Sequence, residues 1–376
     1  MMKAHISLKG IPKCLMHAIC ICMMVSVLFF TGSAPLRGQN GNGSDFEEFI
    51  KQLSEVAGKR YIAPISNSFT TDLNGGWFHR APRPKKFSFN LEFGLIGMGT
   101  FYREVDKHFS TSGDFRFNSD LAAQMVEDLG LQPEVQQALI DKITTMDFTV
   151  DLSGATIIGD PDDHIKIVFN GADVTFTDPN TGQPRTETVP SQEMSLEFGG
   201  VEVIKKIPFF PFAAPQVGIG TILGTQAVFR YFPSIKIPDI GKLSFFGWGV
   251  QHNPGAWLPF KLPFDIALGY FQQNLKVGDI LEANTTAYGV SASKRLGWGS
   301  LNITPYAGFM IEDSSIDVTY DFVVDDQTIP IEFKLKGENK NRFILGLSIR
   351  LFLLNLNADY NFGQFNSFTV GVMFAI

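Results

Sequence analysis

Cysteine is nearly absent from this sequence, and its placement removes it from the chemistry. The three cysteines, Cys14, Cys20 and Cys22, lie inside one apolar stretch near the amino terminus. If that stretch is a removable leader, the mature chain has no thiol for a disulfide or a zinc site. A lipoprotein needs its cysteine directly after the apolar run, so lipidation is excluded as well.

Basic residues are fewer than acidic residues in this sequence. The chain has 31 Lys and Arg against 38 Asp and Glu, a net charge of −7. Removal of a leader ending at Gly38 takes away four basic residues and no acidic one, which leaves a net charge near −11. A chain this acidic, without a basic cluster, is a poor ligand for phosphate backbones, so nucleic acid is excluded as a partner.

Long apolar runs are missing after residue 30. The one long run, Cys14–Phe30, follows three lysines and precedes small and polar residues, which is typical of a secretory signal peptide over residues 1–38. Cleavage after Ala34 or after Gly38 fits this pattern. The alternative is an amino-terminal anchor helix, because a run of about 17 residues reaches the lower limit for a membrane span.

Histidine is also scarce. Beyond the leader there are four, His79, His108, His164 and His252, and none has the spacing of metal ligands. Only His252 stands at the end of an expected strand beside polar residues, and it has no neighbouring serine to activate. The sequence therefore predicts no catalytic, metal or cofactor site and a protein that is not an enzyme.

What the chain has in abundance is phenylalanine and glycine, 36 of each. The last residues alternate strictly, with Phe368, Val370, Val372, Phe374 and Ile376 on one face and small or polar residues on the other. A period of two indicates a β-strand. The preceding strand pairs an apolar face with a face made of asparagine and aspartate.

The same alternation recurs in further segments, most of them close to the length of a tilted strand that crosses a membrane, about 9 to 11 residues. Such segments lie at 87–95, 226–231, 264–271, 301–309, 343–350, 354–362 and 368–376. Apolar faces rich in Phe, Leu and Tyr opposite polar faces fit strands between lipid and a wet lumen. The sequence therefore predicts an all-β protein, a transmembrane antiparallel β-barrel of about 12 strands (range 10 to 14). The alternative is a secreted β-sandwich or a lipid-binding periplasmic sheet.

Residues 39–85 do not fit a barrel wall. Asp45–Gly58 places its apolar residues on one face of a short helix, and Tyr61–Arg83, rich in Asn, Gly and Pro, is expected to be irregular. A segment ahead of the first strand, which we place at Phe87, can fold into the lumen as a plug. It can equally be a periplasmic tail, and the sequence leaves both open.

A second departure from the wall is an α+β insertion at about 102–211. Helices are expected at Ser119–Gly130 and Pro133–Thr145, followed by short strands from Met146 and from His164. Such an insertion could cap one mouth of the barrel, or part of it could join the wall. The barrel is thus expected over 86–376 with this interruption.

Three weaker patterns have simple interpretations. Asp160–Asp163 and Asp178–Gly182 resemble calcium loops but lack the full spacing, and turns are the favoured interpretation. Gly218, Gly220 and Gly224 lack the strand-to-helix context of a phosphate loop. Three tryptophans near expected strand ends suit an interfacial aromatic girdle, although soluble proteins also place Trp at sheet margins: Trp248, Trp257 and Trp298.

Several segments resemble an uncharacterised group of outer-membrane proteins of Gram-negative bacteria, classed under a domain of unknown function. They are Tyr61–Pro64, Asp72–Trp77, Gly247–Asn253, Leu262–Ala267 and Leu354–Ile376. More distantly, the chain is similar to the long-chain fatty acid and aromatic hydrocarbon channels, which carry a plug before the barrel. It departs from such barrels in ending on Ile376, where Phe is usual.

The resemblance implies the outer membrane as the location, with outer-membrane lipid and the barrel-assembly machinery as partners. By analogy with the fatty acid channels, the leading hypothesis is a passive channel or transporter for a small apolar or amphipathic solute. A non-conducting structural or surface barrel is the alternative, and a barrel-embedded hydrolase comes last.

Overall fold

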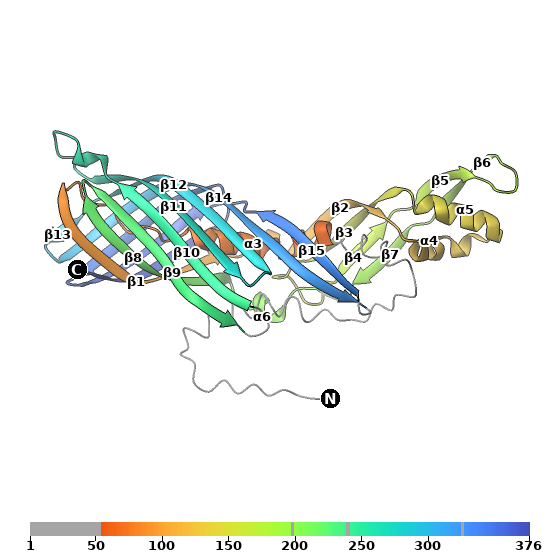
Figure 1. Cartoon of the computed structure of the whole chain (residues 1–376), viewed down its shortest axis with the longest axis horizontal. Helices are drawn as coiled ribbons and strands as arrows, with labels where there is room; N and C mark the ends of the chain where they lie inside the picture. Colours follow the sequence, from red (N-terminus) through yellow and green to blue (C-terminus); the bar gives the residue numbers. More distant parts are fainter. Residues whose placement is uncertain (1–53, 197–198, 238–240, 325–326) are drawn as a thin grey trace, which may run out of the picture.

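A computed structural model shows an elongated molecule, with a barrel at one end and an α/β subdomain at the other (Figure 1). It describes residues 54–196, 199–237, 241–324 and 327–376. The expected signal peptide, and the part of the expected amino-terminal helix before residue 54, lie outside the described residues.

In this described part, ten strands form a closed antiparallel barrel. Each strand pairs with the next along the chain, and the ring closes because the first strand pairs with the last. The wall consists of β1 (Phe87–Phe101), β8 (Phe209–Ile222), β9 (Thr225–Ile237), β10 (Gly241–His252), β11 (Asp265–Val277), β12 (Leu281–Ser293), β14 (Leu301–Val324), β16 (Asn341–Leu351), β17 (Leu354–Gly363) and β18 (Ser367–Ala375).

The alternating faces are arranged inside out relative to a soluble protein. On β18, the side chains of Val370, Val372 and Phe374 are 47–49% exposed, whereas Thr369 and Met373 on the opposite face are each 1% exposed. The neighbouring β17 likewise turns its asparagines and aspartate into the barrel and its apolar side chains outward. A secreted sandwich would bury the apolar face, so that alternative is wrong and the predicted barrel is confirmed.

The ten wall strands lie at the lower end of the predicted range, because two further strands join the sheet without entering the ring. β13 (Leu296–Trp298) pairs with the start of β14, and β15 (Gln327–Lys336) pairs with its end. β14 has 24 residues, so its second half runs beyond the barrel with β15 as a hairpin. This hairpin reaches the subdomain (Figure 1).

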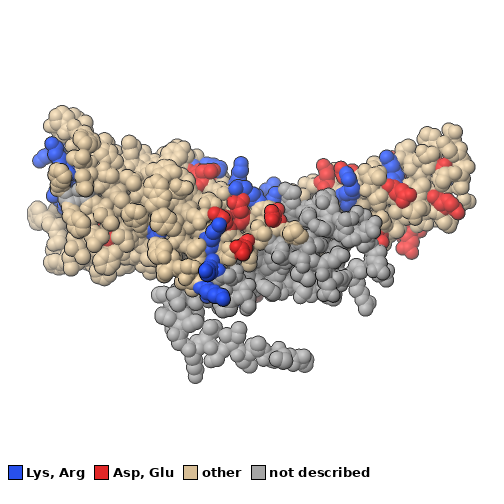
Figure 2. Space-filling model, viewed as in Figure 1, with Lys and Arg blue, Asp and Glu red and all other residues tan. Residues whose placement is uncertain are grey.

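The outer surface of the wall is apolar. Exposed Phe, Leu, Ile, Val or Tyr side chains lie on all ten wall strands. Figure 2 shows few charged side chains over the barrel wall on the face in view and more at its ends and over the subdomain. Trp257 and Trp298, 62% and 92% exposed, stand at one end of this apolar belt.

The two ends of the barrel differ in their connections. At one end β8 and β9 are joined by Leu223 and Gly224, both at positive φ, and β16 and β17 by a turn whose first residue, Phe352, also has positive φ. Such two-residue hairpin turns suit twisted antiparallel strands. The same end carries the longer connection 253–264 between β10 and β11, and we call it the short-turn end after its two hairpins. The opposite end carries the insertion and the β14–β15 hairpin.

The insertion between β1 and β8 is a separate α/β unit. Its elements are η2 (Glu104–Asp106), β2 (His108–Arg116), α4 (Ser119–Val126), η3 (Glu127–Leu129), α5 (Pro133–Ile143), β3 (Asp147–Ala155), β4 (Ile165–Phe169), β5 (Ala172–Thr177), β6 (Pro184–Val189), β7 (Gln192–Leu196) and α6 (Glu202–Lys205). Asn118 caps α4 through its side chain, and Pro133 starts α5. Among the described strands, none of β2–β7 pairs with the wall.

The subdomain has its own apolar core. α4 and α5 pack Val126, Leu139 and Ile143 against β3 and β4, and all three side chains are fully buried. Ile331 of β15 belongs to the same core. The subdomain is therefore attached to the barrel by packing as well as by the chain.

Within the part of the chain that the structure describes, no helix combines the length and the hydropathy needed to cross a bilayer.

Candidate functional site: the plugged lumen

The barrel lumen contains a helix that precedes the first strand. After a π-helical turn, η1 (Ser54–Gly58), α3 (Lys59–Asn74) contacts β1, β8, β12, β14 and β15 (Figure 1). The expectation of an irregular Tyr61–Arg83 is wrong up to Asn74. Pro64 is tolerated in the first half of α3, and a helix satisfies its own backbone groups in a confined space where few other partners are at hand.

The buried surface of α3 is mostly polar. Ten of its residues are buried, and seven of these are polar: Ser66, Asn67, Ser68, Thr70, Thr71, Asp72 and Asn74. The inner wall around the helix is mixed: polar side chains such as Thr100 and Arg230 stand beside a buried apolar cluster in which Phe69 and Leu73 of α3 pack on Ile96, Phe210 and Phe245. Plug and wall are therefore held together by hydrogen bonds and ion pairs rather than by an apolar core alone.

Arg230 of β9 caps the carboxyl end of α3. Its Nη1 donates to the Leu73 carbonyl (3.1 Å) and its Nη2 to the Gly75 carbonyl (2.7 Å), while its Nε donates to Gln216 (2.9 Å). Its guanidinium also lies 4.0 Å from the centre of the Trp77 ring. A cation satisfies the otherwise unpaired carbonyls of a helix end and suits its partial negative charge.

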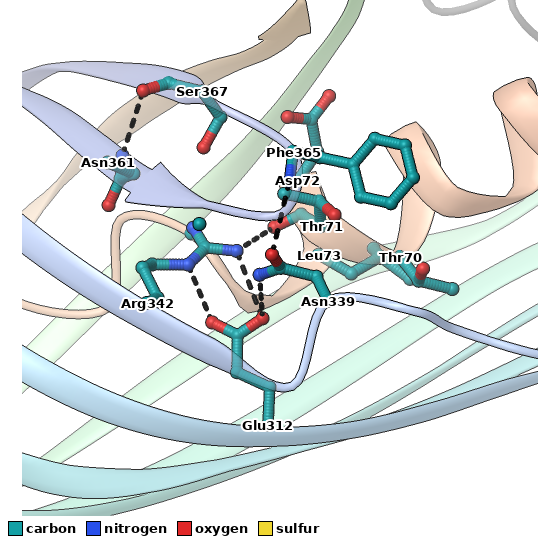
Figure 3. A network of polar contacts seen from close by, with 12 residues as sticks. Thr70, Thr71, Asp72, Leu73, Glu312, Asn339, Arg342, Asn361, Phe365 and Ser367 are labelled. Carbon is teal, nitrogen blue, oxygen red and sulfur yellow. Dashed lines mark hydrogen bonds and ion pairs between the residues drawn. The ribbon is translucent and has the colours of Figure 1, made fainter. Parts of the chain in front are cut away.

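Arg342 of β16 holds the same turn from the opposite wall (Figure 3). Its Nη2 donates to the Thr71 carbonyl (2.5 Å), and its Nε lies 2.6 Å from a carboxylate oxygen of Glu312 on β14. Asn339 donates to the second oxygen of that carboxylate (2.9 Å). Both charged side chains are 1% exposed, so the pair is desolvated and each ion depends on the other.

Two further contacts fix the helix along its length. The Thr100 hydroxyl donates to the Asp72 carboxylate (2.6 Å), which is fully buried. Nearer the start of the helix, the Asn67 amide donates to the Glu338 carboxylate (3.0 Å) and accepts from the Glu338 backbone N–H (3.1 Å). The plug is thus bonded to β1, β9 and β16 and to the loop after β15.

After the helix the chain turns sharply at Gly76, whose φ is +66°. A Cβ atom there would lie 2.6 Å from Ile96 and 2.8 Å from Thr369, so glycine is required by both conformation and space. The turn places Trp77 against Phe271, with ring centres 5.0 Å apart. An aromatic cluster therefore fills the lumen beyond the helix.

The plug leaves the lumen at the short-turn end, where arginines gather. Arg80 and His79 both lie against Glu92 of β1, the histidine at 3.2 Å. The Ala81 N–H donates to Ser293 (3.0 Å), two residues before Arg295, and Arg350 donates to the Ala375 carbonyl (3.2 Å).

Arg83 completes this group. Burial, together with the nearby charges of Arg295, Arg80 and Arg350, lowers the pKa of Arg83 to about 10. Asp265 partly offsets this repulsion. Four guanidinium groups therefore share one mouth of the barrel.

The histidines singled out in the sequence do not come together. His252 accepts a hydrogen bond from the Trp257 indole (3.1 Å) at Nε2, so its Nδ1 carries the proton and faces Thr225 (3.0 Å). His108 and His164 lie exposed on the subdomain, the former 3.6 Å from Asp163. The arrangement of His252 joins β9 and β10 to the loop that follows them.

Both acidic loops form turns. Asp178 accepts hydrogen bonds from the backbone N–H groups of Asn180 (2.8 Å) and Thr181 (3.3 Å), and these bonds and Arg185 lower the pKa of its carboxyl. Asp160 pairs with Lys205 at 2.7 Å, which lowers the Asp160 pKa. Among the described residues, no group of three or more His, Cys, Asp or Glu is placed to bind a metal.

The residues that hold the plug were not predicted from the sequence. Arg230 was visible only as one member of a polar strand face, and Glu312 and Arg342 were not singled out. One signal could have indicated them: each is a charged side chain on the inward face of an alternating strand. A small polar residue would be enough there if the side chain only contacted water. What each of these charges contacts depends on the plug and could not be inferred from strand periodicity.

The sequence matches a protein family over almost its whole length. Residues 16–376 match DUF6588, a family of unknown function. The chain belongs to this family. The match agrees with the resemblance to an uncharacterised group, whereas the more distant similarity to fatty acid channels stays a prediction. No curated protein matches the sequence.

Solved outer-membrane barrels are similar over most of this chain but only loosely superimposable. The β domain of the Bordetella autotransporter BrkA is 11% identical, with 76% of this chain and 99% of that chain covered and a TM-score of 0.27. The outer-membrane protease OmpT of Escherichia coli is 8% identical, with coverages of 78% and 100% and a TM-score of 0.26. OmpT of Vibrio cholerae is 10% identical, with coverages of 77% and 100% and a TM-score of 0.21. At such scores these barrels say nothing about the function of this chain.

Proposed function

We propose that this protein is a gated passage of the bacterial outer membrane, closed by its own amino-terminal plug. The apolar belt on the outside of a closed antiparallel wall supports insertion into outer-membrane lipid by the barrel-assembly machinery. The polar inner wall supports a water-filled lumen once the plug is released.

The observation that carries the gate is the polarity of the plug. A permanent filler would be stabilised best by apolar packing, which is lost when it is exposed to water. Here seven of the ten buried residues of α3 are polar, and two arginines bond its last turn. Water can replace such bonds at modest net cost. The apolar contacts that release of the plug would expose are those of Phe69 and Leu73 with the wall cluster around Phe210 and Phe245.

We infer a polar solute, in place of the apolar one that the similarity to fatty acid channels implies. The described inner wall presents many Gln, Asn, Ser, Thr and Arg side chains between two apolar clusters, around Phe245 and around Phe271. The four arginines at the short-turn end favour negatively charged solutes, because a mouth of one sign concentrates ions of the other.

The connections support one orientation. Outer-membrane barrels have short turns on the periplasmic side and longer loops outside. The short-turn end then faces the periplasm, and the subdomain with the start of α3 faces the exterior. A membrane-impermeant lysine reagent that labels Lys166 and Lys206 of the subdomain in intact cells would support this orientation. Labelling of the subdomain only after the cells are opened would contradict it.

The gate is tested by current through single proteins in planar bilayers. We expect the wild type to stay closed and the Arg230→Ala/Arg342→Ala variant to open repeatedly, because the last turn of α3 then has no cationic partner. Arg116→Ala, which removes an exposed ion pair with Asp147 on the subdomain, is the matched control and should stay closed.

A disulfide separates release of the plug from general leakage. Thr70 of α3 and Gly337 after β15 are close enough for a Thr70→Cys/Gly337→Cys bridge, since a Cβ at Gly337 would lie 3.1 Å from the Thr70 hydroxyl. Ser314→Ala makes room for it, because the same Cβ would meet the Ser314 hydroxyl. In the arginine double variant, oxidation should abolish the current and reduction restore it. A correctly folded double variant that never conducts would refute the gate.

A non-conducting barrel that presents the subdomain is a second candidate, favoured by one observation. The outer end of the plug belongs to the subdomain, because Ala57 lies in its core and the Tyr61 hydroxyl donates to the Gly199 carbonyl (3.0 Å). In that case the helix is a permanent pin between the two parts. We propose no enzymatic activity and no cofactor.

A further inference from the structure

A cavity of about 370 Å³ lies where the plug, the subdomain and the β14–β15 hairpin meet. The first turns of α3 form one side of it, Thr111 and Ser112 of β2 a second, and Leu335 and Lys336 of β15 a third. This volume is at the lower end of the range of small-molecule sites. A molecule bound here would touch three parts of the protein at once.

The lining of the cavity is cationic in a chain that is acidic as a whole. Lys59 and Arg60 come from the plug and Lys336 from β15, and Glu338 is the one carboxylate among the described lining residues. Lys59 and Arg60 are adjacent in sequence, and the fold brings Lys336 toward them. Gathering like charges costs free energy, and an anion between them would remove that cost.

Glu338 is already engaged by neutral partners. The Asn67 amide donates to one of its oxygens (3.0 Å) and the Gln364 amide to the other (2.7 Å). These bonds hold the carboxylate between the plug and the loop after β17.

The remaining lining is suited to an organic molecule. Val56, Ala63 and Leu335 provide apolar surface, and Ser66 and Thr111 provide hydroxyl groups that can donate hydrogen bonds. Only Val56, Ala63 and Leu335 of the eleven described lining residues are apolar, so the cavity suits a molecule whose contacts are mostly polar.

We propose that this cavity binds a small organic dianion that bridges Arg60 of the plug and Lys336 of β15. Its two charged groups carry carboxylate or phosphate oxygens, and its short apolar part lies on Ala63 and Leu335. The cations come together in this way only when the plug is in the lumen, so the ligand binds the closed barrel more tightly than the open one. By linkage, the ligand keeps the barrel closed. This last step rests on the proposed gate, whereas the binding does not.

Binding is measured by calorimetry on the folded mature chain in detergent, with succinate, inorganic phosphate and uncharged succinamide as probes. We expect one saturable site for succinate and none for succinamide. The Arg60→Gln/Lys336→Gln variant should bind succinate about 10-fold more weakly, since two partly exposed charge contacts of about 0.7 kcal/mol each correspond to that factor. Lys166→Gln, which removes an exposed lysine of the subdomain sheet outside the cavity, is the matched control and should bind like the wild type.

Three results would overturn the site: no saturable binding of succinate, equal affinities in the cavity variant and the control, or binding of phosphate alone. Both variants alter exposed side chains, and the shift in electrophoretic mobility on heating checks that each barrel is folded. The effect on the gate is measured separately, as current through the Arg230→Ala/Arg342→Ala variant with and without succinate. A site that binds without reducing this current would refute the linkage only, and a variant that never conducts would refute the gate and leave the binding result standing.

Discussion

Replacing Arg342 by methionine leaves the buried Glu312 carboxyl in the lumen without its cationic partner. The two side chains are 2.6 Å apart and 1% exposed, so solvent screens the pair very little. Removing one member of a buried pair costs about 3–5 kcal/mol, mostly because the other ion remains desolvated. The Thr71 carbonyl also loses its donor, which adds about 1 kcal/mol.

The same reasoning makes a prediction for the double variant. Arg342→Met/Glu312→Leu removes both ions and keeps their volume, so we expect it to recover most of the loss. The free energy of unfolding is measured by urea titration of the protein in lipid vesicles for the wild type, both single variants and the double variant. The coupling energy of this cycle should exceed about 2 kcal/mol.

Lys340 and Asp313 provide the matched control, because they form an exposed pair (3.2 Å) next to the buried one. Lys340→Met should cost less than about 1 kcal/mol. If Arg342→Met costs no more than Lys340→Met, the buried pair does not hold the plug and the reasoning fails.

Three further predictions address the wall, the plug and the subdomain. Val372→Arg, on the outward face of β18, should cost about 2–4 kcal/mol of unfolding free energy in lipid if it lies near the bilayer midplane, and an unchanged value would contradict the assigned face. Gly76→Ala should expose the plug to added protease, because alanine fits neither the positive φ nor the space, whereas Gly182→Ala, also at positive φ but with open space, is the control. The pKa of the Asp178 carboxyl is lower in the folded protein than in the unfolded chain, so the ionised carboxylate stabilises the fold fully above about pH 4. This stabilisation is lost as the pH falls through the pKa of the folded state. Hydrogen-exchange protection of β5–β6 should therefore decrease between pH 5 and pH 2, and an equal decrease in Asp178→Asn would refute this cause.

The sequence by itself determined the wall. Side chains on a strand alternate between two faces, so the residues of one strand alone show which face is apolar. In β18 the apolar face consists of Val370, Val372 and Phe374, and Thr369 and Met373 lie on the other face. Closure then follows from the need to pair every strand edge. The starts of α4 and α5 could also be predicted from neighbouring residues, since Asn118 and Pro133 mark them.

Only the tertiary structure decided what fills the lumen. Residues 59–74 carry Pro, Ser, Thr and Asn, which argue against a helix in isolation, and the helix forms because the wall binds its polar face and Arg230 and Arg342 bond its last turn. Those arginines are separated from the plug by more than 150 residues along the chain, so periodicity cannot indicate the contact. The cationic cavity has the same origin, because Arg60 and Lys336 become neighbours only when the plug, the subdomain and the hairpin are assembled.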